Sequence, residues 1–133
     1  MKFAICNEVF EGWSIDDSIR CVAETGYYAS EIAPFTLAQY VTEIPIAERQ
    51  RIRSMAEDNG IEVSAIHWVL IKTEGLYMTH MDEAVREKTS DYFCELVDCC
   101  ADLGGKAIVV GSPKLRNLLP GVSFEQSWEL AQE

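Results

Sequence analysis

Two side chains in this sequence, His67 and Glu31, are placed where they could move a proton. His67 ends an apolar segment, and Glu31 stands between apolar residues in an earlier one. An imidazole changes protonation near neutral pH and can also bind a sugar hydroxyl or carbonyl, whereas a carboxylate in apolar surroundings must be paired, protonated or at a strand mouth. We therefore predict catalytic roles for both. The alternative is purely structural: a partly buried histidine bonded to a neighbouring strand, and a paired glutamate.

A second polar group follows the apolar run at residues 107–110. It consists of Ser112, Lys114, Arg116 and Asn117. No Asp or Glu occurs between residues 103 and 124, although the whole chain has 22 acidic and 11 basic residues. Arg116 could clamp a phosphate or carboxylate through two hydrogen bonds, with Lys114 as a second charge. We predict that this group binds substrate, and an ordinary loop with solvated cations is the alternative.

Two further residues complete the predicted substrate-binding set. Asn7 falls at the carboxyl end of the first apolar segment, and Trp68 directly follows His67. An indole ring can stack on a sugar ring, although it can equally pack outward against helices.

Strand-like and helix-like segments alternate along the chain and would position these residues. Strands are expected at residues 2–7, 27–33 and 61–68 and from residue 106, with helices starting at Ser14, Pro45, Thr79 and Ser123. Strands that alternate with helices pair in parallel through right-handed crossovers. The order predicts an α/β fold of the (βα)4 type, either an open doubly wound sheet or half of an eight-stranded barrel. In both, ligands bind at the carboxyl ends of the strands.

Composition limits the classes of partner. The chain has 133 residues, the length of one domain, and is 48% hydrophobic. A net charge of −11 disfavours nucleic acid and anionic membranes, and no apolar stretch is long enough to span a bilayer. The first residues lack the apolar region of a signal peptide, so we expect a cytoplasmic protein. The five cysteines include no C-x-x-C pair, and we expect them to be small buried residues rather than metal ligands.

Three segments of the chain resemble the sugar phosphate isomerase/epimerase proteins of the xylose isomerase-like TIM-barrel superfamily. They are GYYASEI at residues 26–32, NGIEVSAIHW at residues 59–68 and LGGKAIVVGSPKLRN at residues 103–117. The resemblance implies a (β/α)8 barrel, about twice this length, of which the sequence matches the first half. We accordingly expect residues 1–133 to be one partial barrel domain, truncated at its carboxyl end.

The resemblance also implies an activity. Its members are isomerases or epimerases that act on a sugar or sugar phosphate, with a divalent metal held by Glu, Asp and His residues of later strands. No position in this sequence matches those ligands, so we assign no metal site here. Three alternatives remain: a DNA-repair enzyme like endonuclease IV, which shares the barrel; a non-catalytic half-barrel that forms a homodimer through its open edges; and a truncated product without activity.

Overall fold

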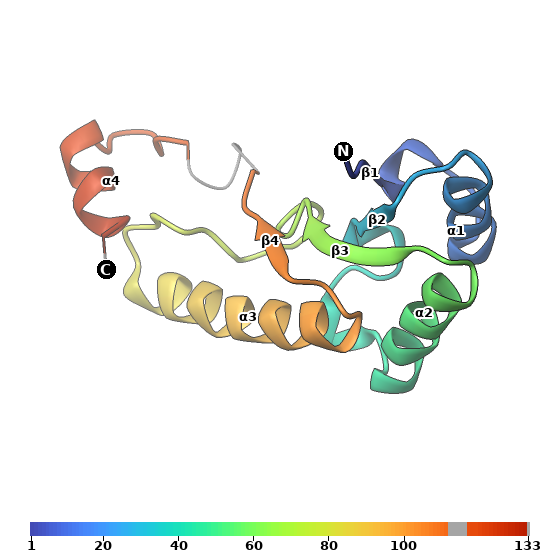
Figure 1. Ribbon diagram of the computed structural model, residues 1–133. Helices are drawn as coiled ribbons and strands as arrows, with labels where there is room; N and C mark the ends of the chain where they lie inside the picture. The colour runs from blue at the N-terminus through green and yellow to red at the C-terminus, as the bar shows by residue number, and fades with distance from the viewer. Residues whose placement is uncertain (112–116, 133) are drawn as a thin grey trace.

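Four strands and four α-helices alternate along the chain in the computed structural model, which describes residues 1–111 and 117–132 (Figure 1). The strands are β1 (Ala4–Cys6), β2 (Ala29–Ile32), β3 (Glu62–His67) and β4 (Ala107–Val109). The helices are α1 (Ile15–Glu24), α2 (Ile46–Asp58), α3 (Glu83–Asp102) and α4 (Phe124–Leu130). Three 3-10 turns lie between them, at Asn7–Val9, Pro34–Thr36 and Val41–Glu43.

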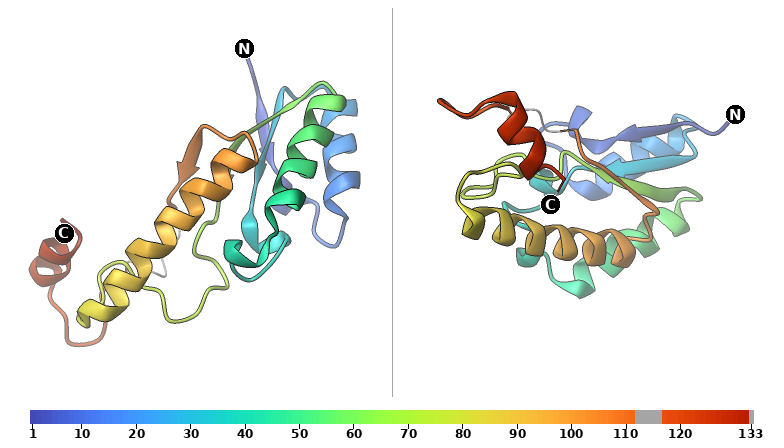
Figure 2. Two further views of the ribbon diagram at one scale, coloured as in Figure 1. Left: turned by 90° about the horizontal axis from the view of Figure 1, so that it is seen from below. Right: turned by 90° about the vertical axis from the view of Figure 1, so that its left-hand side faces the viewer.

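The strand order separates the two architectures that the sequence left open. All pairs are parallel, and the order β1-β2-β3-β4 follows the chain without reversal. A doubly wound sheet reverses direction at a switch point, whereas a barrel adds each strand beside the previous one. The predicted (βα)4 half-barrel is therefore confirmed. Helices α1, α2 and α3 lie side by side against one face of the sheet (Figure 2).

The two faces of the sheet have different chemistry. Ile32 and Ile66 are fully buried within the apolar core that also includes residues of α1, α2 and α3. Because successive strand residues point to opposite faces, Glu31 and His67 project from the other face. The pairing of β2 with β3 shifts by one residue between Ser30 and Glu31, so that Glu31 lies opposite Ala65.

Helix caps test the boundaries expected from the sequence. The hydroxyl of Ser14 accepts from the Asp17 amide, and Ser123 forms a reciprocal capping box with Gln126, so both helices begin at the predicted residues. The predicted start of α3 at Thr79 is wrong. Asp82 itself caps that helix, because its carboxylate accepts from the Ala84 amide, while Thr79 is buried in the preceding loop. In the part of the chain that the structure describes, no helix has the length and apolar character needed to cross a membrane.

Candidate functional site

The side chains of Glu31 and His67 meet at the carboxyl ends of β2 and β3. His67 Nδ1 lies 3.2 Å from a carboxylate oxygen of Glu31, and both side chains are a little over one quarter exposed. Despite this short distance the two groups do not form an aligned hydrogen bond, since the buried Nδ1 atom has no hydrogen-bond partner. Buried polar atoms are nearly always bonded, so the unbonded Nδ1 atom marks the pair as a candidate ligand site.

Cys6 is the third member of this cluster and was missed in the sequence. It is the last residue of β1 and lies opposite Glu31 in the sheet. The donor atoms of Cys6, Glu31 and His67 all lie within 4.8 Å of one another. Burial raises the pKa of the Cys6 thiol to about 11. The signal that could have revealed Cys6 is its place at a strand end, on the same face as Glu31.

Trp68 follows the cluster in an unusual backbone conformation. The sequence placed it inside the strand, but its φ angle of 59° lies in the left-handed region, which bulky residues rarely occupy. Its ring stacks on His67 with centroids 5.5 Å apart, and its buried Nε1 atom has no hydrogen-bond partner. Backbone strain of this kind concentrates at functional sites. The predicted role of Trp68 in substrate binding stays a prediction.

Asn7 lies directly after Cys6 and is only 5% exposed. Its amide nitrogen donates to the Thr36 hydroxyl at 2.8 Å, and its amide oxygen accepts from the Ala33 amide at 2.8 Å. These bonds join the turn after β1 to the turn after β2. Asn7 therefore shapes the wall of the site, and direct contact with substrate stays a prediction.

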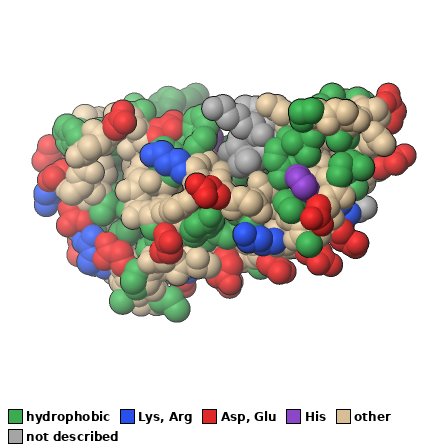
Figure 3. Space-filling model, turned by 180° about the vertical axis from the view of Figure 1, so that it is seen from behind, with side chains coloured by type: hydrophobic (Ala, Val, Ile, Leu, Met, Phe, Trp, Pro, Cys, Tyr) green, Lys and Arg blue, Asp and Glu red, His purple; other side chains and the backbone are tan. Residues whose placement is uncertain are grey.

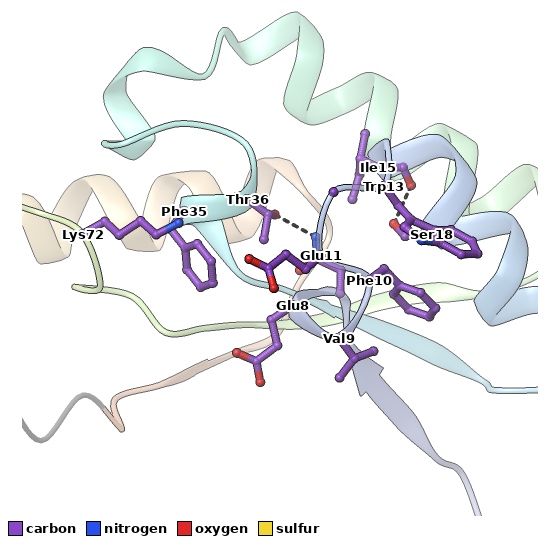
Figure 4. Close-up of a pocket in the computed structure, with 12 residues that line it drawn as sticks. Glu8, Val9, Phe10, Glu11, Trp13, Ile15, Ser18, Phe35, Thr36 and Lys72 are labelled. Atoms are coloured by element: carbon purple, nitrogen blue, oxygen red, sulfur yellow. Dashed lines mark hydrogen bonds between the residues drawn. The ribbon is translucent and has the colours of Figure 1, made fainter.

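A cavity of about 690 Å³ opens beside Asn7 (Figure 4). Most of its lining comes from the turns after β1 and β2. It includes Glu8, Phe10, Glu11, Trp13, Phe35, Thr36 and Lys72. In Figure 4, the Glu8 and Glu11 carboxylates lie between Phe35 on one side and Phe10 on the other. Glu31 and His67 do not line this cavity, but Asn7 joins the two regions because it adjoins Cys6.

Lys72 comes from the long segment between β3 and α3. Its ammonium group lies 4.6 Å from the centre of the Phe35 ring, and its backbone has a φ angle of 63°. The backbone oxygen of Lys72 also accepts a hydrogen bond from the Gln39 side chain. The segment thus packs against the turns after β2, an arrangement that the sequence did not predict.

The predicted anion-binding group lies only partly within the described residues. Ser112, Lys114 and Arg116 lie outside the described residues. Asn117 is exposed, and its backbone oxygen accepts a hydrogen bond from the Tyr77 hydroxyl. Lys106, at the other end of β4, lies 3.8 Å from Glu62, away from the strand ends that carry the cluster.

Comparison with known families agrees with the barrel architecture indicated by the strand order. The family model described as xylose isomerase-like TIM barrel matches residues 19–133. The chain belongs to this family. No curated protein sequence matches it.

Solved structures of epimerases resemble this member of the family along nearly its whole length. A D-psicose 3-epimerase determined in the presence of D-fructose superposes with a TM-score of 0.75 at 24% identity, covering 98% of this chain and 45% of that one. The D-psicose 3-epimerase with D-tagatose from Clostridium cellulolyticum H10 gives 0.74 at 19%, with the same two coverages. The 3-keto-D-glucoside 4-epimerase from E. coli gives 0.68 at 18%, covering 98% and 48%. The chain spans less than half the length of these three structures.

Proposed function

We propose that this chain forms the first half of a sugar isomerase or epimerase that binds a sugar or sugar phosphate. The observation that carries the proposal is the meeting of Glu31 and His67, 3.2 Å apart, at the strand ends where barrels of this family bind ligands. The epimerase structures that share its fold support the same class of substrate.

The proposed chemistry is proton transfer next to a sugar carbonyl. One carboxylate oxygen of Glu31 takes the proton from the carbon beside the carbonyl, and His67 donates a hydrogen bond to a sugar oxygen. In the superfamily that the sequence resembles, a divalent metal held by later strands polarises this carbonyl. This chain contributes the proton-transfer group, the hydrogen bonds and one wall of the pocket.

The cavity beside Asn7 suits the uncharged part of a sugar. Its aromatic side chains offer apolar faces for a sugar ring, and the Glu8 and Glu11 carboxylates can accept hydrogen bonds from hydroxyl groups. Among the charged residues of its lining, these two carboxylates outnumber the single cation, Lys72. A phosphate would therefore bind elsewhere, and the basic group with Arg116 remains the predicted anchor.

Proton exchange with solvent tests this proposal directly. The protein is incubated in D2O with D-fructose, D-psicose, D-tagatose and their phosphates, and deuterium incorporation beside the carbonyl is followed by NMR. Glu31→Gln should slow exchange at least about 100-fold, while the matched control Glu11→Gln should mainly weaken binding. Saturation-transfer NMR measures sugar binding in the same samples. The proposal is wrong if the native protein neither binds nor exchanges any of these sugars.

The DNA-repair alternative has less physical support. The face seen in Figure 3 carries many acidic side chains and few basic ones, in keeping with the net charge of −11. A protein that neutralises phosphates needs a segregated basic stripe. Filter binding to duplex DNA at low salt checks this, and tight binding would favour the repair enzyme.

A homodimer that completes the barrel is the second candidate. Strands β1 and β4 each pair with one neighbour only among the described residues, and open strand edges recruit further strands. Near the β1 edge, Phe3 is 61% exposed. Light scattering separates the cases, since a stable monomer at high concentration excludes this dimer.

A further inference from the structure

The open face of the sheet carries three different metal-binding side chains close together. Cys6 and Glu31 are direct partners in the pairing of β1 with β2. His67 is two residues beyond Ala65, which lies opposite Glu31, so it projects from the same face one step nearer the strand ends. Adjacent strands thus bring a sulfur, an oxygen and a nitrogen donor together.

The absence of a hydrogen bond to His67 Nδ1 suggests that this atom is available as a metal ligand. Its Nδ1 atom is buried and lacks a hydrogen-bond partner, although a Glu31 oxygen lies only 3.2 Å away. With no proton aligned between them, the Nδ1 lone pair and the carboxylate oxygen can both face one cation. In tetrahedral zinc sites with bonds of about 2.0–2.3 Å, neighbouring ligand atoms lie about 3.3–3.8 Å apart. The 3.2 Å between His67 Nδ1 and the Glu31 oxygen is close to this range, and the Cys6 sulfur lies within 4.8 Å of a ligand atom of each.

We propose that Cys6, Glu31 and His67 bind one Zn²⁺ ion, through the thiolate sulfur, one carboxylate oxygen and Nδ1. Thiolate and imidazole donors select zinc over magnesium or calcium, which prefer oxygen ligands. Binding releases the thiol proton to solvent. Three protein ligands leave the fourth position open, as in catalytic zinc sites, and the partial exposure of Glu31 and His67 provides a path to it.

This site is separate from the metal that the family resemblance implies, whose ligands are expected on later strands. It shares Glu31 and His67 with the proposed sugar chemistry, but it can be tested separately, because the ion can bind without any substrate. The ion binds only the Nδ1 nitrogen of the imidazole. The other nitrogen, Nε2, therefore keeps its hydrogen and can donate a hydrogen bond in a defined direction. Nε2 points toward Gly111, where an added Cβ would lie 3.8 Å away. The His67 hydrogen-bond role proposed above is therefore compatible with zinc binding.

Metal titration of the native chain tests the site. The protein is stripped with a chelator under a phosphine reductant and titrated with Co²⁺, then with Zn²⁺ against a chromophoric chelator. We expect one equivalent of ion and a near-ultraviolet thiolate-to-cobalt band. Cys6→Ser should remove the band, and Cys6→Ser or His67→Gln should weaken Zn²⁺ binding at least about 100-fold, with a smaller loss for Glu31→Gln.

Matched controls lie elsewhere in the chain. Cys21→Ser and His80→Gln change a partly exposed thiol and the second histidine, and both should keep the native affinity. Circular dichroism verifies that each variant is folded. The proposal is overturned if the native chain binds no stoichiometric Zn²⁺, or if Cys21→Ser removes the band while Cys6→Ser retains it.

Zinc X-ray absorption on the unmodified protein gives a test that needs no variant. One sulfur at about 2.3 Å together with nitrogen or oxygen neighbours at about 2.0–2.1 Å is the expected first shell. A shell without sulfur, or with two or more sulfurs, would place the ion on other residues and refute the site.

Discussion

Two polar pairs in this molecule, Arg49–Asp102 and Glu31–His67, are built in opposite ways. Arg49 is 6% exposed and all three of its guanidinium nitrogens donate: Nη1 to Asp102 at 3.0 Å, and the other two to backbone oxygens of the turn before α2. His67 Nδ1 lies 3.2 Å from a Glu31 oxygen, yet it makes no hydrogen bond. A fully satisfied pair stabilises the fold, whereas an unsatisfied pair at a strand end holds capacity for a ligand.

Removing Arg49 breaks the satisfied pair and should have the largest effect. Arg49→Ala removes the guanidinium donor from Asp102 and from the Ile44 carbonyl oxygen, and one of the two donors of the Val41 carbonyl oxygen. We expect a loss of about 3 kcal/mol in the free energy of unfolding, measured by urea denaturation. The control Arg20→Ala, which removes an exposed pair with Asp17, should cost less than about 0.5 kcal/mol. Equal losses in the two variants would contradict the assigned difference.

The rates at which Cys6 and Cys99 react with an alkylating reagent compare solvent access to the site with solvent access to the core near Arg49. Burial raises the pKa of Cys6 and of Cys99 to about 11 in each case, but Cys6 is partly exposed at the site and Cys99 is fully buried near Arg49. With the metal removed, iodoacetamide should label Cys6 at least about 100-fold faster than Cys99. Since both thiols are protonated below pH 11, each rate should rise about tenfold per pH unit between about pH 8 and 10.

Peptide mass spectrometry follows both cysteines in one sample, with exposed Cys94 as the fast reference. A Cys6 rate that stops rising below about pH 9 would show that its thiolate is more stable than the burial of the side chain indicates.

Tyr92 tests a single bond of the satisfied region. Its hydroxyl accepts from the buried Val41 amide at 3.0 Å, and Val41 also supplies a carbonyl oxygen to Arg49. Tyr92→Phe leaves that amide without a partner and should cost about 1.5 kcal/mol in urea unfolding. The control Tyr77→Phe, whose hydroxyl donates to an exposed backbone oxygen, should cost less than about 0.5 kcal/mol. If Tyr77→Phe lowers the free energy of unfolding as much as Tyr92→Phe, burial of the hydrogen bond does not explain the loss of stability.

His67→Leu should have the smallest effect on stability. In the presence of a chelator, we expect the free energy of unfolding to change by less than about 0.5 kcal/mol, because the substitution removes a buried nitrogen that has no partner. The same variant should lose zinc binding. A destabilisation of more than about 2 kcal/mol in the chelated protein would make the pair structural and remove the contrast with Arg49.

The comparison also explains what the sequence could and could not predict. Local signals were sufficient for the caps at Ser14 and Ser123 and for the strand–helix alternation, because capping and periodicity depend on near neighbours. His67 and Glu31 were predicted from their places at strand ends, and the structure brings their side chains together. Cys6 was missed because a lone thiol in an apolar strand reads as a core residue until its partners across the sheet are known.

Longer-range features needed the structure. Arg49 lies three and seven residues before the buried Ile52 and Ala56, but its bonds to the preceding turn and to Asp102 of α3 depend on tertiary packing. The left-handed backbone of Trp68 and the cavity lining at Phe35 and Lys72 depend on packing between separate loops. Asp82 replaced the predicted Thr79 cap because several polar residues precede α3 and local sequence cannot rank them.

The one-residue shift between β2 and β3 determines which face of the sheet each later residue of β3 occupies. Ser30 pairs with Val63 and Ile32 with Ile66, so two steps along β2 correspond to three along β3. A regular strand would turn Val63 and Ile66 to opposite faces, yet both are buried in the core. The extra residue, Ser64, thus lets Val63 and Ile66, three residues apart, both face the core while His67 lies on the open face. Without Ser64, a regular β3 could not both bury Val63 in the core and place His67 on the open face. The same extra residue therefore supports both the core packing and the site.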